Sequence, residues 1–549
     1  MFCYKCQQDS YTRLCQVEGI CAKDPASVAV EEFLLQGLKL ISIYAKKISE
    51  YSIVPDCFFE TIISVLHTSI QNIQVDKSEI TKLLEQIEFT KEELKLKHKE
   101  IMLQRGFQLD ILDSQLYWNV NYSINEVIKQ GEKIISKRMN LYNQDELNLI
   151  SLLMVSLKGI VRNAIQAKYL GIENAEVKRF FYETLFKLTQ NLSKQILHEL
   201  VLESGRINLI AIEDLECGLS ARYGNYENVK VRTSAIKGPA ILVSGRDIRD
   251  LENILKYTES KNINIYTHGE MLLAHTLPEL KKFRNLVGHY GGISTDQQLE
   301  IESFPGPVVI TSNCAWNPPQ VFRGRIFTIG SPVWMGVKQI VNHNYLPLVN
   351  AALDSEGFLA DEEEEYSEVG FNLPRFENYA NRIKENVASG EISHVFLIVG
   401  CSSYDMKREY IEEFIKSVPK DAIIIKFSGL GFSDIPLGEI NGIPRILDFG
   451  LYNDLVFVLK FFEDAGKVLG NELPPDKFSM VFFLRDQNAV AVLMSIFILG
   501  NQNNNIKIDT CTKSMLSPVI FKALEENFGI KQNADPRQDI QDFLNLKQD

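Results

Sequence analysis

The chain has 549 residues, of which 45% are hydrophobic and 23% are charged. These fractions exclude disorder as the main state, and the length predicts about three or four domains rather than one small module. The 58 basic and 71 acidic residues give a formal net charge of −13, and the sequence has no block of Lys and Arg, so nucleic acid is not an expected partner.

The sequence does not predict a secretory signal. Its opening residues, Met-Phe-Cys-Tyr-Lys-Cys, lack the order of a basic stretch followed by an apolar stretch that marks an export signal. Strongly apolar stretches such as residues 489–499 are shorter than the roughly 18 to 20 residues of a membrane span. We therefore expect a cytoplasmic protein that does not bind membranes.

Four of the nine cysteines lie within the first 21 residues, at Cys3, Cys6, Cys15 and Cys21. An odd number of cysteines without an export signal indicates a reducing compartment, where clustered thiols serve metal or redox chemistry more often than disulfides. Four thiolates supply one ligand to each iron of a 4Fe-4S cluster. Zinc would also accept four thiolates, but zinc ribbons usually carry two CxxC pairs and this segment has one. The spacing thus favours an iron–sulfur cluster over zinc, and both over a chance cluster of structural cysteines.

Helical patterns follow these cysteines. Asp24-Pro25 is a typical helix start, because Asp24 can cap the first turn and proline is tolerated at the first helical position. Apolar residues then recur at helical spacing, for example over residues 150–160. Residues 76–104 are rich in Lys and Glu with the same apolar spacing, which predicts an amphipathic helix with a solvated face. We expect a helical-bundle domain over residues 1–220.

Beyond a loop predicted at residues 220–225, short runs rich in Val and Ile alternate with helical patterns. Near-continuous apolarity is typical of strands that are buried on both faces of a parallel sheet. The predicted strands are residues 240–244, 263–267, 308–312, 395–399, 422–427, 445–449, 480–484 and 506–509. We interpret the acidic run at residues 361–365 as a solvated connection, and we expect two α/β domains, over residues 221–385 and 386–549.

The residues that follow each strand are candidates for a site, because ligands bind beyond the carboxyl ends of strands in open parallel sheets. Polar or sulfur-bearing side chains occur there at Arg246, His268, Glu270, Cys314, Cys401 and Asp486. A lone buried cysteine is usually structural, but Cys314 and Cys401 follow their strands at equivalent places and suggest a shared pocket. For His268 and for His275, which follows it, a hydrogen-bonded core histidine is the default expectation.

Longer motifs carry a resemblance to a known family. They are MFCYKC at 1–6 with the four-cysteine spacing, YTHGEML at 266–272, SNC at 312–314 followed by PP at 318–319, VGC at 399–401, GIPRILD at 442–448, AVAVL at 489–493 and LSP at 516–518. With these motifs the chain resembles, over essentially its whole length, the hybrid-cluster protein family, also called prismane or hydroxylamine reductase, which is distantly related to carbon monoxide dehydrogenases. The resemblance implies a helical domain followed by two Rossmann-like α/β domains that meet over a pocket.

The resemblance also implies two metal centres. In such proteins the N-terminal cysteines, here Cys3, Cys6, Cys15 and Cys21, hold a 4Fe-4S cluster. A second, oxygen-containing hybrid cluster is bound by one histidine, two glutamates and four cysteines. Matched position by position, Glu270 corresponds to the first glutamate, Cys314 to one thiolate, and Cys401 to the cysteine that is a persulfide in the oxidised form.

Four further positions depart from the family pattern. Arg246 takes the place of the histidine, Leu430 and Tyr452 take the places of two cysteines, and Asp486 takes the place of the second glutamate. Leucine has no lone pair, arginine stays protonated and repels a cation, and tyrosine is a poor substitute for a thiolate in a sulfur-based cluster. We therefore expect an altered or incomplete second cluster, because at most four of its seven ligands remain.

The altered pocket has three interpretations. In the favoured one, Arg246 forms a salt bridge with Glu270 and Asp486 that fills the space of the missing metal. In the second, Arg246 binds a small anion. In the third, the remaining carboxylates and thiolates hold a smaller metal site, to which Cys511 could add a thiolate, although a structural role is favoured for Cys511.

Two functions remain open. The first is an iron–sulfur oxidoreductase resembling hydroxylamine reductase, in which electrons enter through the N-terminal cluster and hydroxylamine or nitric oxide is reduced at Glu270, Cys314 and Cys401. The second is a non-catalytic relative that keeps the 4Fe-4S cluster as an electron relay, a redox sensor or an interaction protein. The resemblance favours the enzyme, whereas the altered ligands favour the second function. The resemblance further implies a role under nitrosative stress, an electron-donor protein such as an NADH-dependent reductase and, if the protein is active, a small nitrogen-containing substrate.

Overall fold

The computed structural model describes residues 25–70, 77–107, 123–291, 297–311, 319–330, 336–369, 373–399, 407–427, 437–448, 477–484, 487–499, 505–510 and 518–545. The chain divides into two compact units. A helical unit comprises Met1–Leu215, Asp486–Ile498 and Met515–Asn527, and an α/β unit comprises Glu216–Arg485, Leu499–Ser514 and Phe528–Asp549. The domain boundaries at residues 220 and 385 stay predictions.

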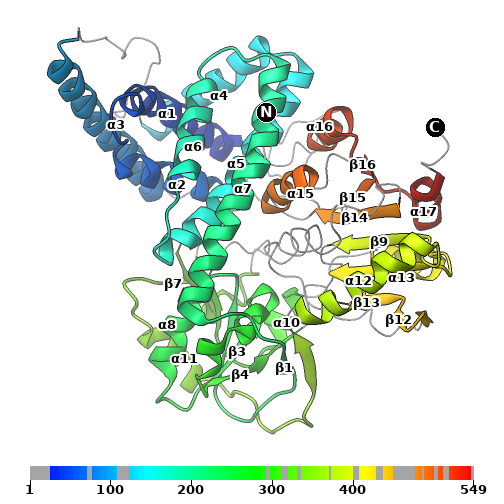
Figure 1. Cartoon of the computed structure of the whole chain (residues 1–549). Helices are drawn as coiled ribbons and strands as arrows, with labels where there is room; N and C mark the ends of the chain where they lie inside the picture. The colour runs from blue at the N-terminus through cyan, green and yellow to red at the C-terminus, as the bar shows by residue number, and fades with distance from the viewer. Residues whose placement is uncertain are drawn as a thin grey trace. The chain divides into compact units, whose positions relative to one another are not determined.

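The helical unit is built around its first helix. Its described elements are α1 (Pro25–Ser49), α2 (Asp56–Ile70), α3 (Lys77–Arg105), α4 (Ile124–Leu141), α5 (Gln144–Tyr169), α6 (Ala175–Lys187), the first part of α7 (Lys194–Tyr223), α15 (Gln487–Leu499) and α16 (Pro518–Phe528). Helix α1 starts at Pro25, as the sequence predicts, and contacts α2, α3, α4 and α6 (Figure 1). The approach of α4 to α1 requires glycine, because a Cβ on Gly131 would lie 1.9 Å from the carbonyl oxygen of Ala29.

Helix α5 is the apolar centre of this unit. Asn143 caps it by accepting a hydrogen bond from the backbone of Glu146, whose side chain reaches back in a capping box. By length and composition α5 could cross a membrane, but 94% of its most apolar window is buried inside the protein. Buried polar side chains of α5 also pair within the unit, as in the 3.0 Å hydrogen bond from Asn163 on α5 to Asn208 on α7. The hydropathy of α5 is thus that of a core helix.

The first sheet of the α/β unit is parallel throughout. Its strands are β2 (Ala240–Ser244), β3 (Asn264–His268), β4 (Leu286–His289), β5 (Val308–Ile310), β6 (Ile326–Ile329) and β7 (Lys338–Ile340), in the order β4-β3-β2-β5-β6-β7. The associated helices are α8 (Ile248–Thr258), η2 (Gly269–Thr276), α9 (Pro278–Lys281), α10 (Gln297–Ser303), η3 (Arg323–Arg325) and α11 (Leu346–Leu353). Numbered along the chain, the strands follow the order 3-2-1-4-5-6 of Rossmann folds.

A second parallel sheet repeats that order. It contains β9 (His394–Val399), β10 (Ala422–Phe427), β13 (Ile446–Asp448), β14 (Phe478–Leu484), β15 (Ile506–Thr510) and β16 (Lys531–Gln532), arranged β13-β10-β9-β14-β15-β16. Helices α12 (Leu373–Ser389), α13 (Lys407–Ser417) and α17 (Pro536–Asn545) and the short pair β11 (Glu439–Ile440) and β12 (Ile443–Pro444) complete it. The structure thus confirms the predicted fold class of a helical region with two Rossmann-like α/β sheets.

The eight predicted strands all appear, with ends that shift by up to two residues. The loop predicted at residues 220–225 is wrong over its first four residues, because α7 continues to Tyr223. Contacts from a distant helix hold this last turn: the guanidinium of Arg222 and the hydroxyl of Tyr223 both donate to the carboxylate of Glu252, at 2.9 Å each. The chain then turns at Gly224, whose φ of +86° favours glycine.

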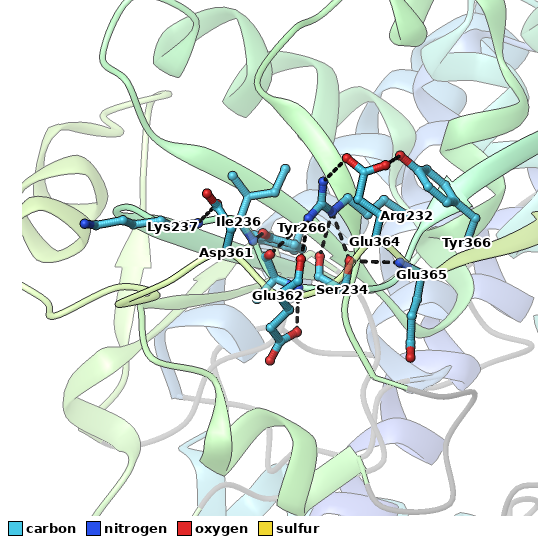
Figure 2. A network of polar contacts seen from close by, with 11 residues as sticks. Arg232, Ser234, Ile236, Lys237, Tyr266, Asp361, Glu362, Glu364, Glu365 and Tyr366 are labelled. Carbon is cyan, nitrogen blue, oxygen red and sulfur yellow. Dashed lines mark hydrogen bonds and ion pairs between the residues drawn. The ribbon is translucent and has the colours of Figure 1, made fainter.

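The acidic run at residues 361–365 is exposed, as expected, but it is anchored (Figure 2). The carboxylate of Asp361 accepts from the backbone of Lys237 at 2.8 Å, and that of Glu362 accepts from the backbone of Ala235 at 2.7 Å. Arg232 binds Glu364 at 3.2 Å, and β1 (Val229–Arg232) pairs antiparallel with β8 (Tyr366–Val369) directly after the run. The run is therefore exposed to solvent, as predicted, and is also anchored to the first part of the α/β unit by these contacts.

Candidate functional site

The strand order explains why site candidates cluster at a few strand ends. The order reverses between β2 and β5 in the first sheet and between β9 and β14 in the second, and each of these pairs is hydrogen-bonded in parallel. Doubly wound sheets bind ligands beyond the carboxyl ends of the strands at such reversals. In sequence, these four strands lead to Arg246, Cys314, Cys401 and Asp486 respectively. Each strand at the two reversal points thus leads to a predicted site position.

Most of the predicted ligands lie outside the described residues. These are Cys3, Cys6, Cys15, Cys21, Cys314, Cys401, Leu430, Tyr452, Asp486 and Cys511. The described part of the site comprises Arg246, which is partly buried, the backbone of Glu270, and the carboxyl edge of the first sheet around them. The interpretations of Arg246 as a salt-bridge partner or an anion ligand stay predictions.

Arg246 and Glu270 follow two adjacent strands at the same offset. Ser244 ends β2 and His268 ends β3, and the two residues are register partners in the parallel ladder. The residue directly after each strand is a glycine with positive φ, +124° at Gly245 and +60° at Gly269. We call residues 244–246 and 268–270 the paired turns. The two predicted site positions therefore occupy equivalent places on neighbouring turns.

A chain of side-chain hydrogen bonds joins the paired turns to α10. The Oγ atom of Ser244 lies 2.9 Å from Nδ1 of His268, and Nε2 of the same ring lies 2.9 Å from Oε2 of Glu300. Ser244 and His268 are buried, and Glu300 is largely covered. Both nitrogens of His268 are therefore engaged, and the expectation of a hydrogen-bonded core histidine is confirmed here.

Two further buried histidines lie beside this hydrogen-bonded series. The Oγ1 atom of Thr267 contacts Nε2 of His275 at 2.9 Å and Nδ1 of His289 at 2.8 Å. Burial lowers the pKa of His275 to about 4, and burial followed by the neighbouring histidines lowers the pKa of His289 well below its usual value. Both rings are therefore neutral at pH 7. His275 is likewise the core histidine that the sequence predicts.

Two carboxyl groups stand at the start of α8, next to Arg246. Asp247 caps the helix by accepting hydrogen bonds from the backbone of Arg249 and Asp250 at 3.1 and 3.2 Å. Burial raises the pKa of Asp247, and burial together with the charge of Asp247 raises the pKa of Asp250 to about 8. The side chain of Asp247 thus satisfies the backbone N–H groups of Arg249 and Asp250 in the first turn of α8.

Sequence reasoning missed four polar residues at this edge, namely Ser244, Thr267, His289 and Glu300. Ser244 and Thr267 each fall within a predicted strand and resemble ordinary strand residues, while Glu300 and His289 lie on elements that were not predicted. A usable signal existed in the parallel pattern Ser-Gly-Arg and His-Gly-Glu at the two strand ends. The pairing of the two segments, however, depends on the sheet register.

The donor atoms fit one of the two implied clusters. Four thiolates at the N-terminal cysteines match the needs of a 4Fe-4S cluster. The second set does not fit a complete hybrid cluster, because Arg246 and Leu430 offer no lone pair to a metal. His268 does not replace the missing histidine either, since both of its ring nitrogens are hydrogen-bonded. Within the described ranges, no group of three or more His, Cys, Asp or Glu side chains is arranged to hold a metal ion.

Comparisons with known proteins agree over the full chain. A family model described as the Prismane/CO dehydrogenase family matches residues 1–541. A hydroxylamine reductase of Thermodesulfovibrio yellowstonii is 34% identical and aligns with 99% of this chain and all of its own length. A hydroxylamine reductase of Methanocella arvoryzae is also 34% identical, with the same coverage.

The chain is also similar, more distantly, to solved structures. A carbon monoxide dehydrogenase from Thermococcus sp. AM4, crystallised in a nickel-free form, is 12% identical to this chain. It superposes with a TM-score of 0.47, over 96% of this chain and 87% of its own.

Proposed function

The chain belongs to the Prismane/CO dehydrogenase family, and from this premise we propose that it reduces hydroxylamine to ammonia and water, or reduces nitric oxide. Family membership supports an iron–sulfur oxidoreductase. The observation that carries the finer proposal is the similarity to hydroxylamine reductases, which extends from end to end in both chains. A similarity confined to one unit would support only a shared cluster or a shared fold.

In this proposal Cys3, Cys6, Cys15 and Cys21 hold a 4Fe-4S cluster, which supplies one-electron transfer when bound. The support is the donor set itself, because it provides one thiolate for each iron. We place the substrate at the carboxyl edge of the α/β sheets, near the retained positions Glu270, Cys314 and Cys401. Reduction of hydroxylamine consumes two electrons and two protons, so the electrons must come from a partner protein.

The second centre of this proposal is not a complete hybrid cluster. Arg246, Leu430 and Tyr452 stand where three ligands are needed, and two of these side chains cannot donate to a metal. This observation favours a second candidate function, in which the chain keeps the N-terminal cluster and acts as an electron relay, a redox sensor or an interaction protein.

Iron and acid-labile sulfide per chain, with electron paramagnetic resonance on the same anaerobic sample, separate the two candidates. About four irons per chain with one cubane signal would support the relay or sensor. About eight irons with additional signals would support an altered second cluster and the reductase. Loss of the additional signals in Cys401→Ala would assign them to the second site, and Cys217→Ala is the matched control because Cys217 is an exposed cysteine on α7.

The restored ligand set provides the complementary test. We expect the triple substitution Arg246→His, Leu430→Cys and Tyr452→Cys to raise the iron content and the rate of hydroxylamine reduction above those of the unmodified chain. This result would show that ligands alone were lost. If the iron content and the rate stay at the level of the unmodified chain, the edge no longer forms the hybrid-cluster cavity.

The proposed cellular setting follows from the same family. We propose that the protein works in the cytoplasm under nitrosative stress and takes electrons from a donor protein such as an NADH-dependent reductase. Reduction of the N-terminal cluster by NADH and purified candidate reductases, followed by its visible absorption, tests the donor. A lack of reduction by any NADH-dependent protein in anaerobic extract would contradict this part of the proposal.

A further inference from the structure

The paired turns at residues 244–246 and 268–270 are held by side chains as well as by backbone. In the parallel ladder Ser244 and His268 are the last register partners of β2 and β3. Beyond this pair, each of the two segments turns at a glycine with positive φ. Glycine adopts this conformation at little cost in free energy, but it has no side chain that could hold the turn in place. The hydrogen bond between Ser244 Oγ and His268 Nδ1 is therefore a lateral tie at the point where the regular ladder ends.

The tie continues into α10 and is fixed at its far end. Glu300 binds Nε2 of His268, and its carboxylate fills the space over Gly291, the second residue after β4. A Cβ on Gly291 would lie 2.6 Å from the carboxyl carbon of Glu300, so no larger residue fits there with the carboxylate in place. His268 is thus clamped between a strand end and a helix.

Ser244 is also hydrogen-bonded to the residue that follows a third strand. The backbone N–H of Thr311, directly after β5, donates to the carbonyl oxygen of Ser244 at 3.0 Å. The strands β2, β3 and β5 lead in sequence to Arg246, Glu270 and Cys314. One cluster of contacts around Ser244 therefore links the three strand ends from which these site positions extend.

We propose that Ser244, His268 and Glu300 form a clamp that sets the spacing of the paired turns, and that His268 is a positioning residue of the second site. The functional half of this inference rests on the proposed function, because it assumes a site at Arg246 and Glu270. The structural half does not. Removal of the Ser244 hydroxyl leaves a buried ring nitrogen of His268 without its partner, which loosens both turns at once.

The test measures the two turns separately from any chemistry. Hydrogen exchange of the anaerobically purified protein is followed by mass spectrometry on peptides that cover residues 244–247 and 268–271, in the unmodified chain and in Ser244→Ala. We expect exchange to quicken about fivefold to tenfold in both peptides, in line with the loss of one buried hydrogen bond. Ser244→Thr keeps a hydroxyl and is expected to restore slow exchange. Should Ser244→Ala fail to fold, two variants of Glu300 test the clamp from its other end. Glu300→Gln keeps a hydrogen-bond acceptor of the same length, so it is expected to change exchange less than Glu300→Ala does.

The chain offers a matched control at the opposite edge of the other sheet. Ser479 Oγ lies 2.8 Å from Nε2 of His394, and both residues are buried at the amino ends of their strands. Ser479→Ala therefore removes the same kind of hydrogen bond away from every carboxyl strand end. We expect it to leave exchange at the paired turns unchanged. Equal exchange in Ser244→Ala and in the unmodified chain, or an equal rise in Ser479→Ala, would overturn the clamp.

Iron content, paramagnetic signals and hydroxylamine turnover of the same variants test the positioning role. A fall in the second-centre signal or in kcat for Ser244→Ala, with recovery in Ser244→Thr and no change in Ser479→Ala, supports it. Unchanged signals and turnover despite quicker exchange would refute it. If the unmodified chain shows neither a second centre nor turnover, the proposed function fails, whereas the exchange data still decide whether the clamp exists.

Discussion

Two of the ion pairs made by helix α1 differ chiefly in burial, and they allow a controlled measurement of a buried charge pair. Glu32 binds Arg138 on α4 at 2.5 Å, with side chains that are 4% and 7% exposed. Lys46 binds Glu183 on α6 at 3.2 Å, with side chains that are 32% and 37% exposed. Both pairs join α1 to a neighbouring helix of the same unit.

The expected costs follow from what each substitution leaves behind. Glu32→Met leaves the buried guanidinium of Arg138 without the carboxylate of Glu32, which lowers the free energy of unfolding by about 3–5 kcal/mol. Lys46→Met is expected to lower it by about 0–1 kcal/mol. Arg138→Met should cost less than Glu32→Met, because Lys39 still attracts Glu32. Burial already lowers the pKa of Lys39 to about 8, against the opposing attraction of Glu32. The double substitution of Glu32 and Arg138 by Met should lower the free energy of unfolding less than Glu32→Met alone, since it leaves neither charge of the pair buried without the other.

The assay must report on the helical unit, because unfolding of a chain with two compact units is not a two-state process. We would follow urea unfolding by hydrogen exchange of peptides from α1 and α4, and compare the midpoints of the single and double variants. The reasoning is refuted if Glu32→Met shifts the midpoint no more than Lys46→Met, or if the costs of Glu32→Met and Arg138→Met simply add in the double variant.

Three further predictions concern other sites. Gly205→Ala is expected to lower the thermal midpoint, because the added Cβ would lie 2.7 Å from backbone atoms of Met494. The destabilisation by overpacking, about 1–3 kcal/mol, outweighs the gain in helix propensity of about 1 kcal/mol. An unchanged midpoint would contradict the close approach of the two helices. Asp250→Asn is expected to stabilise the protein near pH 8 but not near pH 4. The pKa of Asp250 is raised from 3.8 to about 8, so the unfolded chain releases this proton first and stability falls as pH rises through that window; parallel midpoint-against-pH curves for the variant and the unmodified chain would refute this. His67→Gln is expected to flatten the loss of stability between pH 6.5 and pH 4. Burial and then Arg162 lower the pKa of His67 to about 4, so unfolding takes up a proton in that range, and an unaltered slope would show that the ring is not buried in its neutral form.

The sequence alone determined the elements that depend on local pattern. Runs such as residues 240–244 and 422–427 became strands with the same bounds, because strands buried on both faces are almost continuously apolar. Asp24-Pro25 located the start of α1 for an equally local reason. The position-by-position comparison with a known family likewise needs no coordinates, so the altered residues Arg246 and Leu430 are a property of the sequence.

Strands that are short or partly polar could not be predicted in this way. Strand β4 contains only Leu286–His289, and β7 contains only Lys338–Ile340 with two exposed residues, so neither has an apolar run of its own. Their position in the sheet is decided by the backbone N–H and C=O groups of the neighbouring strand, which need hydrogen-bond partners. The end of α7 has the same origin, since the contacts of Tyr223 with Glu252 come from a helix that is remote in sequence.

The arrangement of the candidate site was decided by tertiary structure. That Ser244 and His268 are register partners, and that Glu300 reaches the same ring, follows from strand order and from the approach of α10, which local propensity does not encode. The acidic run at residues 361–365 is anchored for the same reason. Composition decides which segments are buried, whereas hydrogen-bonding partners are chosen only when segments distant in sequence share one core.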